Sequence, residues 1–422
     1  MTLDQAKTRE EALDVLDGYA AETREDAKLQ RLRRPLVKSY LLETVPHVRT
    51  EPPLESIFTR RGHSLLPLDD TLSKIKRNAD GKIIGLLEKL LPRHPVIYTT
   101  EKSQEMDAWV RNLVDASPAL DNLWLSGRAF DQLYNIILAT KPIHRFGRIV
   151  FQHQSIFELN GAPTPEPQTT AEEDAEDQEE PEQTLQAQED DDNCVPERRS
   201  TRFMVIDRLD RLKTLLPKMR EIYEPLQCIS QLRFPARGNG GHDFYHNGKA
   251  TNRSDSFVDH RLHVKFVLQI YKQATETTET AAWHGVQKSN LAADTSGEII
   301  LGAPVLLQFK QPLSQAVFDQ FIQATFRHKR NVFRLWGNPI QLGPRKVHVY
   351  ALDRHLWQPL YLEITDRQIV VIVPRGTCGN SIHRLVTNVQ QFLDPEVTVW
   401  IGDRSYEDLI QSASTALKIY ED

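Results

Sequence analysis

The chain has 422 residues, of which 40% are hydrophobic and 8% aromatic, enough for two or three domains with ordinary cores. Its longest apolar run, residues 369–373, is far shorter than the about 20 residues that cross a bilayer, and the N-terminus alternates charged and apolar residues. We therefore expect neither a membrane span nor a secretory signal. The cysteines Cys194, Cys228 and Cys378 stand in separate contexts, which excludes a disulfide framework and indicates a reducing compartment, the cytoplasm or the nucleus.

One acidic tract divides the chain. Residues 161–192 hold thirteen Asp or Glu, no Lys or Arg, four prolines and one large aliphatic residue, Leu185. Such a segment cannot bury apolar surface, so we expect a disordered linker over residues 161–199. The whole chain carries a net charge of −6, so the 390 residues outside the tract carry +7. The tract is either a self-repelling spacer or an internal mimic of a polyanion.

The first unit, residues 1–160, is predicted to start with helices and then to alternate strands with helices. Apolar residues at steps of three and four predict helices over residues 9–32 and 72–91. Beyond them the period changes. Apolar runs and helical spacings then follow in the order strand 96–98, helix 106–113, strand 123–125 and a helix from Phe130.

The same order returns near the C-terminus, in register. A shift of 276 positions places residues 122–133 on residues 398–409, so that Trp124 matches Trp400 and Arg128 matches Arg404. Two unrelated stretches with the same element order could also match in this way. We favour an internal duplication, because strand-helix-strand units require this alternation.

The second unit, residues 200–422, mixes helices and strands. A strand over 203–206 leads into a helix over 209–223, in which Pro217 should cause a kink. Residues 231–263 are rich in Gly, Asn and His and are predicted to be irregular. The remaining predicted elements are a strand or buried helix at 262–271, strands at 299–309, 347–350 and 360–364, and a helix at 313–327.

These patterns predict an α/β fold, or a mixed α+β fold, with two folded units joined by the disordered acidic linker. Each unit is expected to contain a βαβα layer with a parallel pair of strands.

The first candidate site is a basic loop rich in His and Gly, residues 233–265. Cations for phosphates and rings for bases are what single-stranded nucleic acid requires. The predicted nucleic-acid-binding residues are Arg233, Arg237, Phe244, Tyr245, Lys249, Arg253 and Lys265.

The same loop also allows a metal site. Imidazoles and a carboxylate could hold a divalent ion that activates water for phosphodiester hydrolysis. The metal-ligand candidates are His242, His246, Asp259 and His263, and the catalytic candidates are His246, Asp259 and His260. Under the alternative interpretation the segment is an ordered loop whose glycines permit sharp turns.

The second candidate site is the turn between the apolar run 369–373 and the next helix. A strand followed by a Gly- and hydroxyl-rich turn aims backbone N–H groups and the positive helix end at the turn, which suits phosphate. The predicted anion-binding residues are Arg375, Gly376, Thr377, Gly379, Asn380, Ser381 and Arg404. Alternatively, Asn380 or Ser381 only caps the helix.

Other residues near these sites receive minor roles. Cys378 stands at the helix start, where the dipole would activate a thiol, but His383 is the only nearby base and no third group orients it. Trp336 and Trp357 are interpreted as core or interface residues rather than stacking platforms.

Three functional hypotheses follow. The leading one is a component of a larger complex that binds a phosphate-rich polymer, with nucleic acid as the first candidate and with protein partners but no membrane. The second is a metal-dependent phosphodiesterase or nuclease, and the third a non-catalytic interaction protein. The sequence establishes no cofactor, and a divalent metal is the one candidate.

Overall fold

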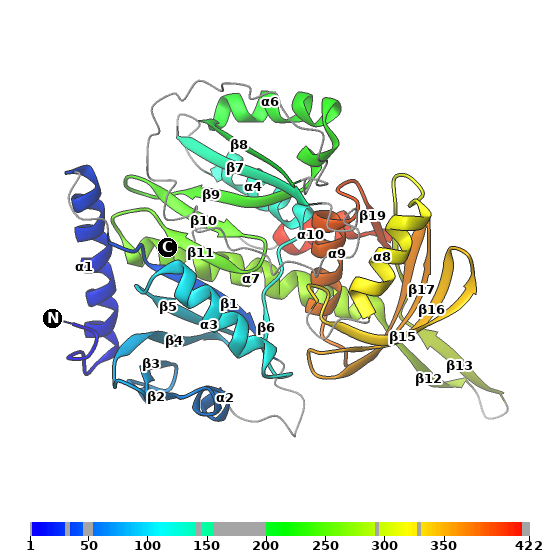
Figure 1. Ribbon diagram of the computed structural model, residues 1–422, viewed down its shortest axis with the longest axis horizontal. Helices are drawn as coiled ribbons and strands as arrows, with labels where there is room; N and C mark the ends of the chain where they lie inside the picture. Colours follow the sequence, from blue (N-terminus) through cyan, green and yellow to red (C-terminus); the bar gives the residue numbers. More distant parts are fainter. Residues whose placement is uncertain are drawn as a thin grey trace, which may run out of the picture.

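The computed structural model places its elements in two sheets with helices around them, an α+β architecture (Figure 1). It describes residues 2–29, 34–44, 54–140, 145–154, 200–291, 295–326 and 331–415. The predicted linker, residues 161–199, lies outside the described residues. No helix within the described ranges is long and apolar enough to cross a membrane.

The first sheet is antiparallel and has the strand order β2-β3-β4-β5-β1-β11-β10-β9-β7-β8, with the short β6 on β1. Its strands are β1 (Lys38–Glu43), β2 (His63–Pro67), β3 (Leu72–Arg77), β4 (Ile83–Leu91), β5 (His94–Thr99), β6 (Asp121–Asn122), β7 (Phe146–Gln154), β8 (Ser200–Arg208), β9 (Ile229–Pro235), β10 (Gly241–Tyr245) and β11 (Lys249–Asn252). The accompanying helices are α1 (Arg9–Lys28), α2 (Leu54–Arg60), α3 (Ser103–Asp115), α4 (Gly127–Thr140), α6 (Leu209–Ile222) and the 3-10 turn η1 (Glu224–Gln227).

The second sheet has the order β15-β16-β17-β18-β14-β19-β20, and a β12-β13 hairpin joins it at β18. Its strands are β12 (Trp283–Leu291), β13 (Thr295–Leu301), β14 (Val305–Gln308), β15 (Leu335–Gly343), β16 (Lys346–Asp353), β17 (Gln358–Thr365), β18 (Gln368–Pro374), β19 (Thr398–Ile401) and β20 (Arg404–Ser405). Its helices are α8 (Gln315–Phe326), α9 (Asn380–Phe392) and α10 (Tyr406–Thr415).

The long helix α7 (Phe257–Ala282) joins the two sheets (Figure 1). Its residues 264–271 pack in the core of the first sheet, while Ala274 and Ala282 pack in the core of the second. Strands β8 to β11 follow the acidic tract in sequence but belong to the first sheet. The predicted units 1–160 and 200–422 therefore share that sheet, and the two sheets divide along α7.

The two sheets repeat one arrangement, as the matching of residues 122–133 with 398–409 predicted. Each copy begins with a strand and a helix. A four-stranded meander follows, and after it come a helix, a strand and a final helix. The first copy runs β1-α2-β2-β3-β4-β5-α3-β6-α4, and the second runs β14-α8-β15-β16-β17-β18-α9-β19-α10. The expected parallel pairs are β5 with β6 and β18 with β19, but they are not neighbours: both members of each pair bond antiparallel to the first strand, β1 or β14.

Two expectations about local structure are wrong. Residues 72–91 form the hairpin β3-β4 rather than a helix, because β4 is buried on both faces and Gly85 passes so close to β5 that a Cβ there would lie 2.2 Å from the Tyr98 carbonyl oxygen. Residues 231–263 are not irregular but form the meander β9-β10-β11 and the start of α7. Gly240, at φ 84°, makes the β9-β10 turn that a β-branched residue would strain.

Other predicted helices are confirmed. Helix α1 begins with a capping box, in which the Thr8 side chain accepts from the Glu11 N–H and the Glu11 side chain bonds back to the Thr8 N–H. Helices α6 and α8 fall where helical spacing placed them, and Pro217 lies inside α6.

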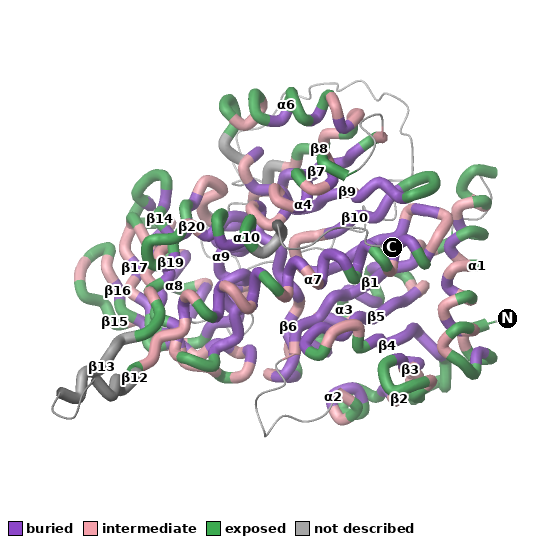
Figure 2. Tube along the Cα trace, turned by 180° about the vertical axis from the view of Figure 1, so that it is seen from behind, coloured by how far each residue is buried: buried purple, intermediate pink, exposed green. Residues whose placement is uncertain are grey.

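Helix α9 lies between the two sheets, and each of its thirteen residues is buried (Figure 2). It contacts β7 and α7, and Gln390 Oε1 accepts a hydrogen bond from the Gly127 N–H at the start of α4, 3.0 Å away. Many of the buried side chains on α9 are polar, so the contact between the two copies consists largely of hydrogen bonds and ion pairs.

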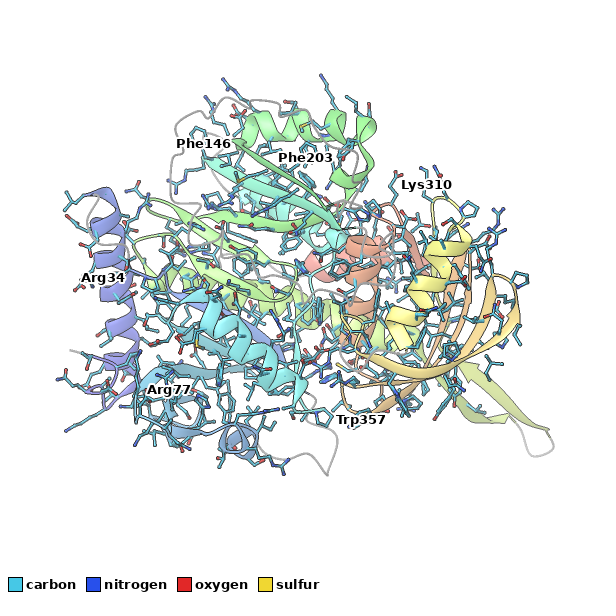
Figure 3. All side chains as sticks on the ribbon, viewed as in Figure 1. Arg34, Arg77, Phe146, Phe203, Lys310 and Trp357 are labelled. Atoms are coloured by element: carbon cyan, nitrogen blue, oxygen red, sulfur yellow. The ribbon has the colours of Figure 1, made fainter. Side chains whose placement is uncertain are left out.

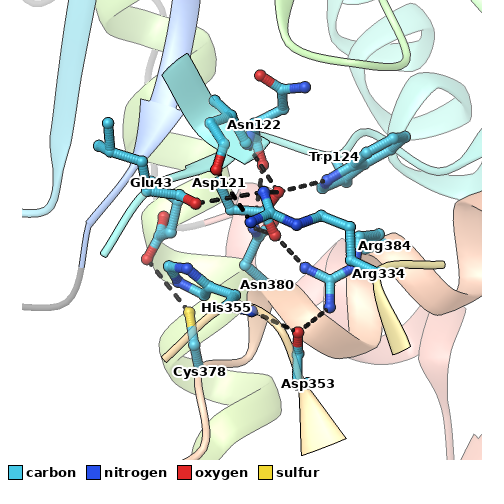
Figure 4. Close-up of polar contacts among 12 residues, drawn as sticks. Glu43, Asp121, Asn122, Trp124, Arg334, Asp353, His355, Cys378, Asn380 and Arg384 are labelled. Carbon is cyan, nitrogen blue, oxygen red and sulfur yellow. Dashed lines mark hydrogen bonds and ion pairs between the residues drawn. The ribbon is translucent and has the colours of Figure 1, made fainter. Parts of the chain in front are cut away.

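The centre of this contact is the carboxylate of Asp121 on β6 (Figure 4). Arg384 of α9 binds it and also binds Asp353 at the end of β16. Arg334, just before β15, adds an Nη1 to Oδ1 contact of 3.1 Å, and Asn380 donates to the other carboxylate oxygen at 3.1 Å. Every group here is buried, so each charge would strongly destabilise the fold if it lost its oppositely charged partner.

A second ion-pair group lies beside the first. Arg93 at the β4-β5 turn binds Glu43 of β1 at 2.7 Å and Glu279 of α7 at 2.8 Å. His94 Nε2 lies 2.7 Å from the other oxygen of Glu43. These ion pairs hold the C-terminal part of α7 against the β4-β5 turn of the first meander.

We expect Asp121→Asn to lower the free energy of unfolding by about 3–5 kcal/mol, because the change leaves two buried guanidinium groups without their shared carboxylate. Urea denaturation followed by circular dichroism measures the loss. Lys272→Ala, which removes an exposed pair with Glu276 on α7, is the control and should cost less than about 1 kcal/mol. Equal losses in the two variants would contradict a central role for Asp121.

Candidate nucleic-acid interface and buried histidine cluster

One face of the second sheet is covered by helices and the other is open. Residues Val347, Val349, Leu360 and Leu362 alternate toward the buried side and belong to the core that α8 and α9 complete. Their neighbours along each strand point to the other side. One ladder of directly paired residues crosses six strands there: Ile340, His348, Glu363, Val370, Leu306 and Trp400.

This open face, which we call the aromatic face, presents four exposed rings: Trp336, Tyr350, Tyr361 and Trp400. Their exposed fractions lie between 38% and 55%. Tyr350 and Tyr361 are direct partners on β16 and β17, with ring centroids 5.2 Å apart. Rings of this size on an open sheet give flat apolar surfaces wide enough for a nucleobase.

The aromatic face carries a carboxylate that already has partners. Glu363 is hydrogen-bonded to His348 at 2.6 Å and paired with Lys346 at 3.0 Å. These partners lower the pKa of the Glu363 carboxyl, with the His348 hydrogen bond as the largest cause. The face therefore offers little repulsion to a polyanion.

Arg375 and Arg404 lie at one edge of this sheet, as the sequence predicted. Strands β18 and β19 run in the same direction on either side of β14, and each arginine follows the end of its strand. Both side chains are exposed, and neither forms an ion pair with a carboxylate of the described residues. Arg404 is the direct partner of Ile401, whose side chain is buried, so the two arginines mark the end of the strands rather than the aromatic face itself.

In the rest of the predicted anion site, other groups of the protein take the place expected for an anion. The Gly379 N–H at the start of α9 donates to Glu279 Oε1 at 2.9 Å, so a carboxylate of α7 occupies the position predicted for phosphate. Asn380 binds Asp121 rather than capping the helix, and Ser381 makes no cap either. Of the predicted residues, Thr377, Gly379, Asn380 and Ser381 are buried, and Gly376 is exposed.

Most residues predicted to bind nucleic acid in 233–265 have partners within the fold. Burial alone would raise the pKa of the Asp243 carboxyl, but Arg233, Arg253 and Arg148 hold it far below its usual value. Phe244 and Lys249 are buried, and Lys249 pairs with Asp107 at 2.9 Å and lies over the Tyr245 ring. Arg237 and Lys265 have exposed side chains.

Of the histidines in the same segment, three converge with one carboxylate. His242 Nε2 of β10 lies 3.1 Å from Asp259 Oδ2 of α7, and His263 Nδ1, one helical turn later, lies 3.4 Å from Asp259 Oδ1. One ligand atom from each of these three residues lies within 4.8 Å of the others. His260 joins the group through His242, with their Nδ1 atoms 3.3 Å apart.

His246 lies outside this cluster. It follows β10 and packs near Trp124, with ring centroids 6.2 Å apart, and its N–H bonds to the Ser230 carbonyl oxygen. The structure thus joins three of the four predicted metal ligands, His242, Asp259 and His263, and leaves out the fourth.

Cys378 and His383 do not form a catalytic pair. Cys378 Sγ lies 3.5 Å from Glu43 and 3.4 Å from Arg93, and burial together with Glu43 raises the pKa of its thiol well above the usual value. His383 Nδ1 instead lies 2.5 Å from the Tyr406 hydroxyl. A buried thiol with a raised pKa is a poor nucleophile.

The sequence interpretation missed the aromatic face. Trp336 and Trp357, expected in a core or an interface, are about half exposed. The available signal was alternation over 347–351 and 360–364, in which every second residue is apolar and the residues between include Tyr350 and Tyr361. Alternation alone does not say which face a helix covers.

Comparison with known proteins identifies a family. The model of the MJECL33-like protein family matches residues 2–157 and 237–408, well over half of the chain, and this chain belongs to that family. The uncharacterized protein MJECL33 of Methanocaldococcus jannaschii is 22% identical over 392 residues, which cover 91% of this chain and 88% of that protein. No solved structure matches the chain. The matched segments include the histidine cluster and the strands of the aromatic face.

We expect His383→Gln to change how stability depends on pH. Burial lowers the pKa of His383 from 6.5 to about 4, so between these pH values the unfolded chain binds a proton that the folded chain does not. Stability therefore falls as the pH falls through this window, by up to about 1.4 kcal/mol per pH unit. Denaturation at several pH values should give a shallower slope for the variant, with a constant difference above about pH 7. Parallel curves between pH 4 and 6.5 would show that His383 is not responsible.

Proposed function

We propose that this protein binds single-stranded nucleic acid on the aromatic face of its second sheet. The observation that carries the proposal is the placement of Trp336, Tyr350, Tyr361 and Trp400 on one open sheet surface, with Arg375 and Arg404 at its edge. The leading hypothesis from the sequence is kept, but the surface is different from the segment 233–265 that suggested it.

Stacking favours a single strand over a duplex. The flat face of a base is available to a side chain only when the base is unpaired and unstacked from its neighbours. Base-aromatic stacking contributes about 1–3 kcal/mol per base and tolerates any sequence. Tyr350 and Tyr361, side by side on β16 and β17, provide the centre of such a surface, and Trp400 lies three strands from Tyr361 across the sheet.

Phosphate contacts are assigned to the sheet edge. Arg375 and Arg404 are exposed and follow the ends of β18 and β19, so a strand that is stacked on the face and leaves the sheet at this end would bring its backbone past them. The 390 residues outside the acidic tract carry +7, which supports attraction of a polyanion from a distance. Glu363 is already paired with Lys346 and hydrogen-bonded to His348.

We expect Tyr350→Ala to weaken binding of a fluorescent oligothymidylate by about 1–3 kcal/mol, with little change in the salt dependence, because stacking releases few counterions. Arg375→Ala and Arg404→Ala should each lower the slope of log affinity against log salt by about 0.7. Fluorescence anisotropy at several salt concentrations measures both quantities.

Matched controls lie elsewhere on the surface. Phe146 on β7 is exposed and lies away from the second sheet (Figure 3), so Phe146→Ala should leave affinity unchanged. Lys265→Ala removes an exposed cation of α7 that the segment 233–265 would use instead. If Lys265→Ala lowers the salt slope and Arg404→Ala does not, the segment rather than the aromatic face is the interface. Failure to bind any single strand at low salt would overturn the proposal and favour a protein partner.

A further inference from the structure

The histidine cluster has the dimensions of a metal site. In a tetrahedral zinc site with bonds of about 2.0–2.1 Å, neighbouring ligand atoms lie about 3.3 Å apart. The separation between Asp259 Oδ2 and His242 Nε2 is 3.1 Å, and a ring nitrogen of His263 belongs to the same group. A modest approach of His242 and His263, whose ligand atoms lie within 4.8 Å of each other, would complete three corners of a tetrahedron.

We propose that His242, Asp259 and His263 bind one zinc ion that fastens β10 to the start of α7. Two imidazoles and one carboxylate form a ligand set that suits Zn²⁺, whereas Mg²⁺ and Ca²⁺ prefer oxygen ligands. The side chains of the three ligands are at most 7% exposed. Three protein ligands leave the fourth position of a tetrahedral ion to water, while the burial keeps a polymeric substrate away from it.

The surroundings hold the ligands in place. The Ser256 side chain and Asp17 of α1 cap the start of α7, with Asp17 Oδ1 accepting from the Phe257 N–H at 2.7 Å. The Arg237 N–H, in the turn between β9 and β10, donates to Asp259 Oδ2 at 2.8 Å. Asp259 Oδ1 is buried and accepts no hydrogen bond from the described residues, so it has a lone pair to give to a cation.

A hydrogen-bonded chain behind His242 can serve both the metal-free and the metal-bound protein. Ser39 Oγ lies 2.7 Å from His260 Nε2, and His260 Nδ1 lies 3.3 Å from His242 Nδ1. Without metal, His242 carries its proton on Nε2 and donates it to Asp259. With metal, the proton moves to Nδ1 and is donated to His260, which in turn donates to Ser39, because a hydroxyl group can donate or accept. Such outer partners fix the ring orientation of a ligand.

The same arrangement specifies the His263 tautomer. Its Nδ1 lies 2.8 Å from the main-chain oxygen of Asp259, so the proton resides there and Nε2 holds the lone pair. A ligating histidine commonly donates its second ring N–H to a carbonyl oxygen in this way. The inference does not depend on the proposed nucleic-acid binding, because the cluster lies on the first sheet and α7.

The test uses the full chain after removal of metal with a chelator and measures Zn²⁺ binding by competition with a chromogenic chelator. The expected result is one tightly bound Zn²⁺ per chain, no comparable binding of Mg²⁺, and a higher melting temperature with Zn²⁺ than without. His263→Gln and Asp259→Asn should each weaken this binding by at least about 100-fold, and His260→Gln by about 10–100-fold.

His246→Gln is the matched control, because His246 belongs to the same segment but lies outside the cluster. It should bind Zn²⁺ as the unaltered chain does. Absorption of Co²⁺ bound in place of Zn²⁺ reports tetrahedral coordination and is independent of stability, so it separates loss of the site from loss of folding. Absence of a tight 1:1 site in the unaltered chain, or an affinity unchanged by both His263→Gln and Asp259→Asn, would overturn the inference.

Discussion

The carboxylate of Asp121 determines how the two halves of this protein fit together. It lies on a two-residue strand of the first sheet and receives Arg384, Arg334 and Asn380 from the second copy. Burying a charge costs several kcal/mol unless its partners are well placed. The two copies therefore fit together in one relative orientation, because a shift would leave several buried charges without partners. Apolar packing alone has no such need for specific partners and would allow the two copies to slide against each other.

The two copies of the repeated arrangement have diverged in how they use their edges. In the first copy, β1 pairs on to β11 and the sheet continues through β10, β9, β7 and β8. In the second copy, β14 pairs with β19, and the sheet ends at the short β20. The first sheet is thus extended by five strands, among which β10 carries His242 of the histidine cluster, while the second sheet has an open face. The aromatic face belongs to the second copy, whereas the histidine cluster lies on β10 and α7, outside the elements of either copy.

Sequence patterns predicted what depends on local periodicity and missed what depends on pairing. Residue spacing was enough to predict the helix over residues 9–28 and the register between residues 122–133 and 398–409. It also selected four metal-ligand candidates, three of which the fold brings together. The hairpin at residues 72–91 was not predicted, since apolar residues of a doubly buried strand also match a helical period. Nor could spacing show that Asp243 binds Arg233 and Arg253, or that Glu279 reaches the start of α9, because these partners are brought together only by the fold.

Helix α7 gives the duplicated molecule a property that two tandem domains would lack. Its 26 residues make a rod about 39 Å long, with Asp259 and His263 at one end and Glu279 at the other. One hydrophobic core packs on the first half of α7 and the other core packs on its second half. If either sheet lost its structure, half of the helix would lose its packing, so neither sheet can unfold while the whole helix stays intact. The protein should therefore unfold as one cooperative unit, and amide hydrogens in the middle of α7 should be among the slowest in the chain to exchange with solvent.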